Sequence, residues 1–321
     1  METPYAKRTP GEPCPLALGT MNFGKRTPAD ESQRIIRRAL ERGIRVFDTA
    51  NAYNGGEAER ILGRALGADR DRVVVATKVG FGRIAGKPEG LSRRAILGAI
   101  DESIERLGTR SVDLYYLHVP DHATPIAETL DALVTIVRAG KVRAWAVSNY
   151  ASWQILEMTT LAADRGLPPP AVSQVLYNLL HRQLDVEYFA FARHAGIHTT
   201  IFNPLAGGLL TGKHHFEEAP LAGSRFEGNA LYQRRYWTRG MFARVDELRA
   251  LAEGQGMTLV QLAYAWAASR PDVDSILVGP ATVAQLDDAF DAVARPLSTE
   301  TVARIDELAR QWNGTDTSYA R

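Results

Sequence analysis

The sequence predicts an α/β fold, a single-domain (β/α)8 barrel that covers residues 1–321. Short apolar segments alternate with longer amphipathic segments along most of the chain, which is typical of parallel strands joined by helical crossovers. Eight such units follow one another, and eight strand–helix units can close a barrel. No Gly-x-Gly-x-x-Gly motif opens any of these helices, which disfavours a doubly wound dinucleotide-binding sheet.

Each expected strand is a short apolar segment, and each expected helix carries apolar residues at helical spacing. In chain order the units are Leu16–Thr20 with Pro28–Arg42, Arg45–Phe47 with Glu57–Leu66, Val73–Thr77 with Ser92–Leu107, Val112–Leu117 with Pro125–Arg138, Val142–Val147 with Ser152–Arg165, Val172–Val175 with Val186–His194, His198–Phe202 with Phe242–Glu253 and Leu259–Ala268, and Ser275–Val278 with Val283–Val293.

Capping residues mark several helix boundaries. Ser92 and Thr124 precede helices and can cap them through their hydroxyls, Thr124 with Pro125 at the first helical position. Gly43, Gly108 and Gly196 follow helices and suit left-handed C-terminal caps. The stretch at about 203–240 is too rich in glycine, arginine and aromatic residues to be a mere spacer, so we expect a cofactor and substrate loop there, and a C-terminal tail at about 312–321.

Charge and cysteine content exclude several classes of protein. Lys and Arg number 38 and Asp and Glu 37, a net charge of +1, which argues against a general nucleic-acid or anionic-membrane binder. Cys14 is the single cysteine, so no internal disulfide forms, as expected in a reducing compartment. Without an apolar signal segment or a transmembrane run, we expect a cytoplasmic protein.

Four ionisable residues are expected at one rim of the barrel. Chemistry in such barrels lies at the carboxyl ends of the strands. Asp48 and Tyr53 follow the second strand, Lys78 the third and His118 the fourth. Singly, each is more often a cap, a solvated side chain or a core residue, but a buried Lys beside an Asp is costly unless the two pair. Paired, they make a charged cluster of the kind found at functional sites.

This cluster suits proton donation to a carbonyl. A neighbouring ammonium lowers the pKa of a phenol, so Lys78, held by Asp48, is expected to make Tyr53 a general acid. His118 can orient the carbonyl oxygen. With no redox cysteine pair and no evident metal cluster, the expected electron source is a bound nicotinamide.

Neutral, aromatic and glycine-rich segments after the later strands suit a dinucleotide. Ser148, Asn149 and Gln174 can hold a carboxamide, and Phe202 can stack on the ring. The expected cofactor contacts are Thr20, Met21, Asp48, Ser148, Asn149, Gln174, Phe202, Asn203, Pro204, Leu205, Ala206, Gly207, Gly208, Leu210, Gly212, Lys213, Arg225, Gly279, Thr282, Gln285 and Asp288.

These residues resemble the aldo-keto reductase superfamily. The matching segments are Phe47–Ala50 with Tyr53, Ala76–Lys78 and Asp113–His118. Within it, the sequence resembles the aflatoxin aldehyde reductase, or succinic semialdehyde reductase, branch. The segments that carry this are Tyr116–His122, Ser148–Tyr150, Phe202–Lys213, Arg225–Phe226, Gly228–Asn229, Tyr232, Arg235–Trp237 and Tyr319–Arg321.

The resemblance implies NADPH-dependent reduction of aromatic aldehydes, dicarbonyls and semialdehydes, in a pocket formed by Tyr53, His118, Tyr232, Trp237 and Arg321. It also implies a homodimer. The segment after the eighth strand, GPATVAQLDDAF, departs from the family pattern at adenosine-binding positions, so NADH stays open as an alternative cofactor.

Other functions stay open beside this one. They are a cofactor-binding, redox-sensing subunit like the potassium-channel β subunits, and a pathway-specific ketoreductase of sugar or natural-product biosynthesis. A glycosidase needs a pair of carboxylates that the rim does not offer, and a zinc hydrolase needs a third ligand beside His214 and His215. No metal is therefore expected.

Overall fold

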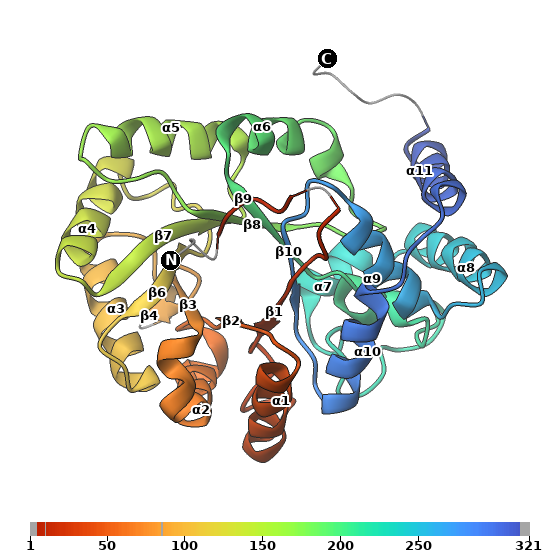
Figure 1. The fold of residues 1–321 in the computed structure, drawn as a ribbon, viewed down its shortest axis with the longest axis horizontal. Coiled ribbons are helices and arrows are strands. Elements are labelled where there is room, and N and C mark those ends of the chain that lie inside the picture. Colours follow the sequence, from red (N-terminus) through yellow and green to blue (C-terminus); the bar gives the residue numbers. More distant parts are fainter. Residues whose placement is uncertain (1–4, 10, 85, 315–321) are drawn as a thin grey trace.

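The computed structural model describes residues 5–9, 11–84 and 86–314, and it confirms the closed parallel barrel (Figure 1). Around the barrel the strands follow the order β1-β10-β9-β8-β7-β6-β3-β2, so each neighbours the preceding and following strand–helix unit. The barrel strands are β1 Leu16–Gly19, β2 Val46–Asp48, β3 Val74–Val79, β6 Val112–Leu117, β7 Val142–Ser148, β8 Val172–Leu176, β9 His198–Phe202 and β10 Ser275–Val278.

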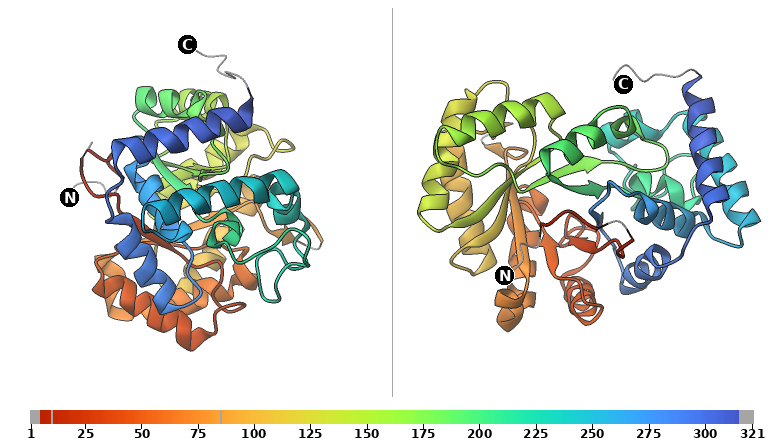
Figure 2. Two further views of the ribbon diagram at one scale, coloured as in Figure 1. Left: turned by 90° about the vertical axis from the view of Figure 1, so that its right-hand side faces the viewer. Right: turned by 45° about the horizontal axis from the view of Figure 1, so that its top comes forward.

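Helices surround the barrel on its outside (Figures 1 and 2). The predicted boundaries agree with the observed ones to within a few residues. The helices are α1 Ala29–Glu41, α2 Glu57–Leu66, α3 Arg93–Leu107, α4 Ile126–Arg138, α5 Ser152–Ala163, α6 Tyr188–Ala195, α7 Ala230–Tyr236, α8 Arg239–Gly254, α9 Leu259–Ser269, α10 Val283–Val293 and α11 Thr299–Asn313.

Some elements differ from the sequence prediction. The expected loop at about 203–240 contains a 3₁₀ segment, Ala206–Thr211, and α7. Helix α11 was not predicted; it lies beside α8, where the Trp312 indole donates to Glu247 (3.2 Å). A short antiparallel hairpin, β4 Arg83–Ile84 with β5 Lys87–Pro88, follows β3.

The caps were predicted in part. Ser92 caps α3 and accepts from the Ala95 N–H, and Gly108 and Gly196 have left-handed C-cap conformations, as expected. Gly43 is left-handed too, but it lies one residue beyond Arg42, the C-cap of α1. The prediction for Thr124 was wrong. Its hydroxyl donates to Asp121 Oδ2 (2.6 Å), and Pro125 occupies the N-cap position of α4.

Alternation along the strands separates two cores. Outward residues pack under the helices in the main core. A smaller cluster of mostly small side chains fills the barrel interior, and Tyr5 packs against it from the N-terminal segment. Its buried members are Ala76, Leu114, Tyr116, Ala146 and Val172.

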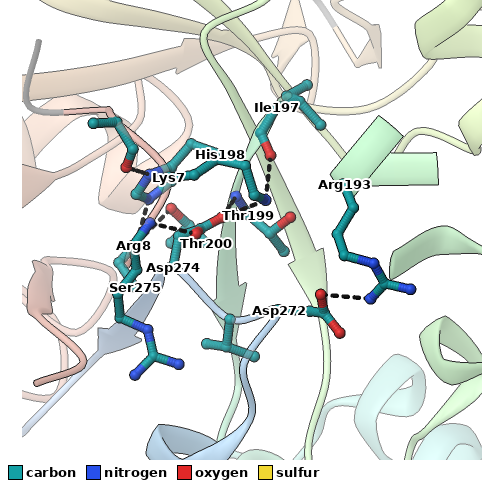
Figure 3. A network of polar contacts seen from close by, with 12 residues as sticks. Lys7, Arg8, Arg193, Ile197, His198, Thr199, Thr200, Asp272, Asp274 and Ser275 are labelled. Atoms are coloured by element: carbon teal, nitrogen blue, oxygen red, sulfur yellow. Dashed lines mark hydrogen bonds and ion pairs between the residues drawn. The ribbon is translucent and has the colours of Figure 1, made fainter. Parts of the chain in front are cut away.

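The N-terminal segment is fixed across the amino ends of β9 and β10 (Figure 3). Buried Asp274 accepts from the backbone N–H groups of Arg8 (2.7 Å) and Thr199 (2.7 Å) and pairs with Lys7 (3.0 Å). The His198 ring bridges the Ala6 carbonyl and a serine of β10. This end of the barrel is therefore closed, and the opposite end carries the predicted site.

None of the helices in the described part of the chain is both long and apolar enough to span a membrane. Within the same residues, no group of three or more His, Cys, Asp or Glu side chains is placed to hold a metal ion. The cytoplasmic location and the homodimer stay predictions.

Candidate active site

Asp48, Tyr53, Lys78 and His118 meet at the carboxyl end of the barrel. Asp48 ends β2, Tyr53 begins the 3₁₀ turn Tyr53–Gly56, and His118 directly follows β6. Lys78 lies within β3 and does not follow it, because β3 extends two residues further than predicted. The alternation of side chains along β3 places Ala76 and Lys78 inside the barrel.

Lys78 is the centre of the site. Its Nζ donates to Asp48 Oδ1, to the Thr49 carbonyl (2.8 Å) and to the Tyr53 hydroxyl (3.5 Å). Lys78 is 0% exposed and Asp48 2%. Burial disfavours the ammonium, but Asp48 and Tyr53 together raise the pKa of Lys78 by more, so it lies above its ordinary value. Lys78 and Asp48 therefore form a buried ion pair, as the sequence predicted.

The Tyr53 phenol differs from the expectation. Burial raises its pKa above the ordinary value, and the Lys78 ammonium lowers it only in part. The predicted direction of the Lys78 effect is right, but the net direction was wrong, because the sequence does not show how completely the ring is buried. Without Lys78 beside it, this phenol would be a still weaker acid.

His118 is a neutral imidazole in this site. Burial and the nearby Lys78 ammonium hold its pKa well below the ordinary value. Its ring lies edge-to-face with Tyr53, at a centroid distance of 5.8 Å. Nδ1 is buried without a partner in the described part of the chain. A neutral imidazole can donate one hydrogen bond to a carbonyl oxygen without adding charge to the site.

The expected carboxamide-binding residues lie next to the four ionisable residues. Gln174 Nε2 donates to Asp48 Oδ2 (2.9 Å), a contact that sequence reasoning missed. The Asn149 amide donates to the His118 carbonyl (3.0 Å) and to Ser148 Oγ (3.0 Å), and Asn149 has a φ of 63°. Phe202 ends β9, the strand beside β8, and its register partner there is Leu176. These side chains therefore border the site that Asp48 and His118 occupy.

The segment after β9 forms a strained, glycine-dependent turn. Asn203, Ala206, Gly207 and Gly208 all have positive φ, and a Cβ at Gly207 would lie 2.7 Å from the Tyr232 ring. The Asn203 side chain accepts from the Gly207 N–H (2.6 Å) and fixes the turn. Non-glycine residues with positive φ cluster at functional sites.

Arg225 is a half-buried guanidinium with neutral partners. It donates to Asn22 Oδ1 (3.2 Å) and the Tyr232 hydroxyl (3.4 Å), and it lies over the Tyr232 ring at 5.6 Å. Thr20 lies two residues before Asn22, and its buried hydroxyl oxygen has no hydrogen-bond partner in the described part of the chain. Uncompensated positive charge and an orphaned hydroxyl fit a polar, anionic ligand.

The remaining expected cofactor residues have simpler surroundings. Met21, Lys213 and Asp288 are exposed, and Pro204 and Leu210 are buried. The Gly279 carbonyl accepts from Asn22 (2.9 Å). Thr282 caps α10, and the Gln285 side chain accepts from the Ala281 N–H (2.8 Å), so both stabilise the start of this helix.

The predicted substrate residues are not all brought together. Tyr232 lies near Tyr53 and contributes to raising its pKa. Trp237 packs in an aromatic cluster with Phe226, His214 and Phe242, at centroid distances of 5.0, 5.3 and 5.0 Å, and none of its ring contacts is with Tyr53 or His118. Arg321 lies outside the described residues.

Sequence reasoning missed the loop after β3. Phe81, 54% exposed, lies tilted against His118 at 5.1 Å. Glu89 accepts from the N–H groups of Gly80 (2.7 Å) and Gly82 (3.2 Å) and from the Asn51 amide (2.6 Å). The Gly-Phe-Gly triplet marks a tight turn beside Lys78, and this signal could have drawn attention to it.

Comparison with known proteins agrees with this geometry. The sequence model of the Aldo/keto reductase family matches residues 15–310. Human aflatoxin B1 aldehyde reductase member 2 is 34% identical over 95% of this chain and 88% of its own length. Human aldo-keto reductase family 7 member A3 is 36% identical over 92% of this chain and 93% of its own length. A probable voltage-gated potassium channel subunit beta of Arabidopsis thaliana is 34% identical over 89% and 90%.

Proposed function

Since this chain belongs to the aldo/keto reductase family and is an NAD(P)H-dependent oxidoreductase, we propose that it reduces aldehydes and ketones with NADPH, with Tyr53 as proton donor. The proposed substrates are aromatic aldehydes, dicarbonyls and semialdehydes. One observation carries the proposal: Lys78, buried and paired with Asp48, touches the Tyr53 hydroxyl beside a neutral His118.

The residues present fit a nicotinamide dinucleotide. Arg225 offers a guanidinium with neutral partners, and Lys213 an exposed ammonium, so both can meet phosphate. The positive-φ turn at Gly207 and Gly208 presents backbone in place of side chains. Ser148, Asn149 and Gln174 would hold the carboxamide end near His118. When bound, the cofactor supplies the hydride.

The four ionisable residues handle the proton and the substrate oxygen. Tyr53 donates its phenolic proton to the carbonyl oxygen, and Lys78 stabilises the phenolate that is left. Asp48 and the Thr49 carbonyl hold the Lys78 ammonium in place. His118, neutral by burial, donates a hydrogen bond to the same oxygen and orients it. Lys78 and Asp48 are buried, so water screens the interaction of their charges with Tyr53 only weakly.

The experiment measures nicotinamide absorbance with NADPH and NADH in parallel, on succinic semialdehyde, 4-nitrobenzaldehyde and a 1,2-dicarbonyl. We expect carbonyl-dependent oxidation of NADPH. Tyr53→Phe should lower kcat about 10²–10⁴-fold with cofactor binding kept, since it removes the general acid. Tyr188→Phe is the control, because Tyr188 lies on α6 and its buried hydroxyl hydrogen-bonds to the Thr199 hydroxyl of β9. Near-normal turnover in Tyr53→Phe contradicts the assignment.

A second function, a redox-sensing subunit, is favoured by the similarity to the plant potassium channel subunit beta. The two proposals differ in turnover. Tight cofactor binding, very slow release of the oxidised cofactor and no turnover on any of the three carbonyls would favour the second function. A pathway-specific ketoreductase with a narrow substrate range would also show no turnover on these three carbonyls.

A further inference from the structure

A second tyrosine lies against the Lys78 ammonium. Strand register pairs Lys78 of β3 with Tyr116 of β6, and Tyr116 with Ala146 of β7. All three belong to the barrel interior, where Tyr116 is 3% exposed and Ala146 0%. The small Ala146 side chain leaves room for the Tyr116 ring inside the barrel.

Two aromatic rings therefore lie close to the Lys78 ammonium. Its Nζ is 5.1 Å from the ring centroid of Tyr53 and 5.5 Å from that of Tyr116. The three Nζ protons point to Asp48, the Thr49 carbonyl and the Tyr53 hydroxyl. A fully buried ammonium has no water on its remaining surface, and an aromatic face within about 6 Å is an electrostatic substitute for it.

The Tyr116 hydroxyl lies near Gln174 and Thr200, on β8 and β9. Gln174 donates to Asp48 Oδ2 (2.9 Å). Tyr116 thus contacts the ammonium through its ring and neighbours the glutamine that bonds to the partner carboxylate. The other buried members of the interior cluster, such as Leu114 and Val172, are aliphatic and offer neither contact.

On this basis we propose that Tyr116 is a positioning residue for the proton transfer: its ring stabilises the Lys78 ammonium beside Tyr53. The proposal rests on the proposed function, because Lys78 matters to the reaction through Tyr53. It assigns the effect to the ring and not to the hydroxyl.

The first test observes Lys78 directly and needs no turnover. The chain has six lysines, so ¹³Cε-lysine NMR can follow each one through an alkaline titration, with Lys78→Met as the assignment variant. In Tyr116→Leu the Lys78 midpoint should fall by about one pH unit, a tenfold change, because a desolvated cation–π contact is lost. In Tyr116→Phe, which keeps the ring, the midpoint should stay near that of wild type.

The matched control is Tyr115→Leu. Tyr115 is the neighbouring buried tyrosine on β6, but it faces the helices, where its hydroxyl meets the Ile96 carbonyl (3.5 Å). The Tyr115→Leu substitution should destabilise the protein without moving the titration midpoint of Lys78. If Tyr116→Leu does not fold, Tyr116→Met, whose longer and more flexible side chain can reach further into the space of the ring, should show the same shift. An unshifted midpoint in a folded Tyr116→Leu or Tyr116→Met protein would overturn the proposal.

The second test is the pH profile of kcat for NADPH-dependent reduction of 4-nitrobenzaldehyde. The alkaline limb should move about one unit lower in Tyr116→Leu and stay in place in Tyr116→Phe and Tyr115→Leu. A lower kcat with an unmoved limb would make Tyr116 a purely structural residue. If wild type reduces no carbonyl, the proposed function fails, and the NMR titration still decides the role of Tyr116.

Discussion

Asp48→Asn should leave the buried Lys78 ammonium without its counter-charge. Asparagine keeps the shape of the side chain but removes the negative charge beside an ammonium that is 0% exposed. Removing one partner of a buried ion pair costs about 3–5 kcal/mol of unfolding free energy. A buried lysine without a counter-charge has its pKa lowered by up to about 3–5 units, so Lys78 should be neutral in the folded variant at neutral pH.

The pH dependence gives the reasoning its sharpest test. In wild type the pKa of Lys78 is raised, so the ammonium is protonated in both folded and unfolded states between pH 7 and 9 and contributes no slope. In Asp48→Asn only the unfolded state binds that proton below about pH 10.4. Stability of the variant should therefore rise with pH by about 1.4 kcal/mol per unit relative to wild type. From pH 7 to pH 9 the gap should narrow by about 2.7 kcal/mol.

The assay is urea unfolding, followed by tryptophan fluorescence at pH 7, 8 and 9. Asp101→Asn is the matched control, since Asp101 pairs with Lys141 at the surface and such pairs contribute about 0–1 kcal/mol. Burial raises the pKa of Cys14 to about 12, but this titration is common to both proteins and cancels in the difference. A gap below about 1 kcal/mol, or a gap that does not change with pH, would refute the reasoning.

Three further predictions concern other parts of the molecule. Because the pKa of folded His118 is depressed, only the unfolded state takes up a proton at this histidine as the pH falls below about 6.5. His118→Gln should therefore reduce the loss of unfolding free energy between pH 6.5 and 5 by up to about 1.4 kcal/mol per pH unit. An unchanged slope in urea titrations would count against a neutral imidazole. Asp274→Ala should cost about 3–5 kcal/mol by the same urea assay, because it leaves Lys7 unpaired and two backbone N–H groups without their acceptor; a cost below about 1 kcal/mol would show that the N-terminal segment is not held there. Gly63→Ala should destabilise by about 1–3 kcal/mol, since its Cβ would lie 2.2 Å from the Leu107 carbonyl oxygen, whereas Gly98→Ala, with open space around its Cβ, should stabilise; thermal melts that show the same sign for both would contradict this packing.

Local sequence patterns were sufficient to predict most of the barrel. Strand and helix boundaries depend on apolar periodicity and on caps such as Ser92, which act within a few residues. The four ionisable residues could be placed because the carboxyl ends of parallel strands meet at one end of a barrel. Thr124 shows the limit of such rules: Asp121, three residues earlier, competes for its hydroxyl, and the helix begins without it.

Long-range contacts could not be predicted. Gln174 and Asp48 are 126 residues apart, and nothing in either strand shows that their side chains meet. The degree of burial of Tyr53, which sets the sign of its pKa shift, depends on the loops that cover it. The same holds for Tyr116, which reads as an ordinary apolar strand residue until the register places it against Lys78.

The closure of the barrel by residues 5–9 has a consequence for how the chain folds. Arg8 leaves the ribosome long before its partner Asp274, which lies 266 residues later. Chains emerge at about 5–20 residues per second, so the N-terminal segment waits on the order of ten seconds or more for its anchor. In refolding of the whole chain the same large separation makes this contact slow to form. Amide protection of Arg8 in pulse-labelled refolding should therefore follow that of strands β3 and β6, which neighbour each other, and simultaneous protection would contradict this order. The segment that closes the barrel is thus expected to become ordered after strands β3 and β6.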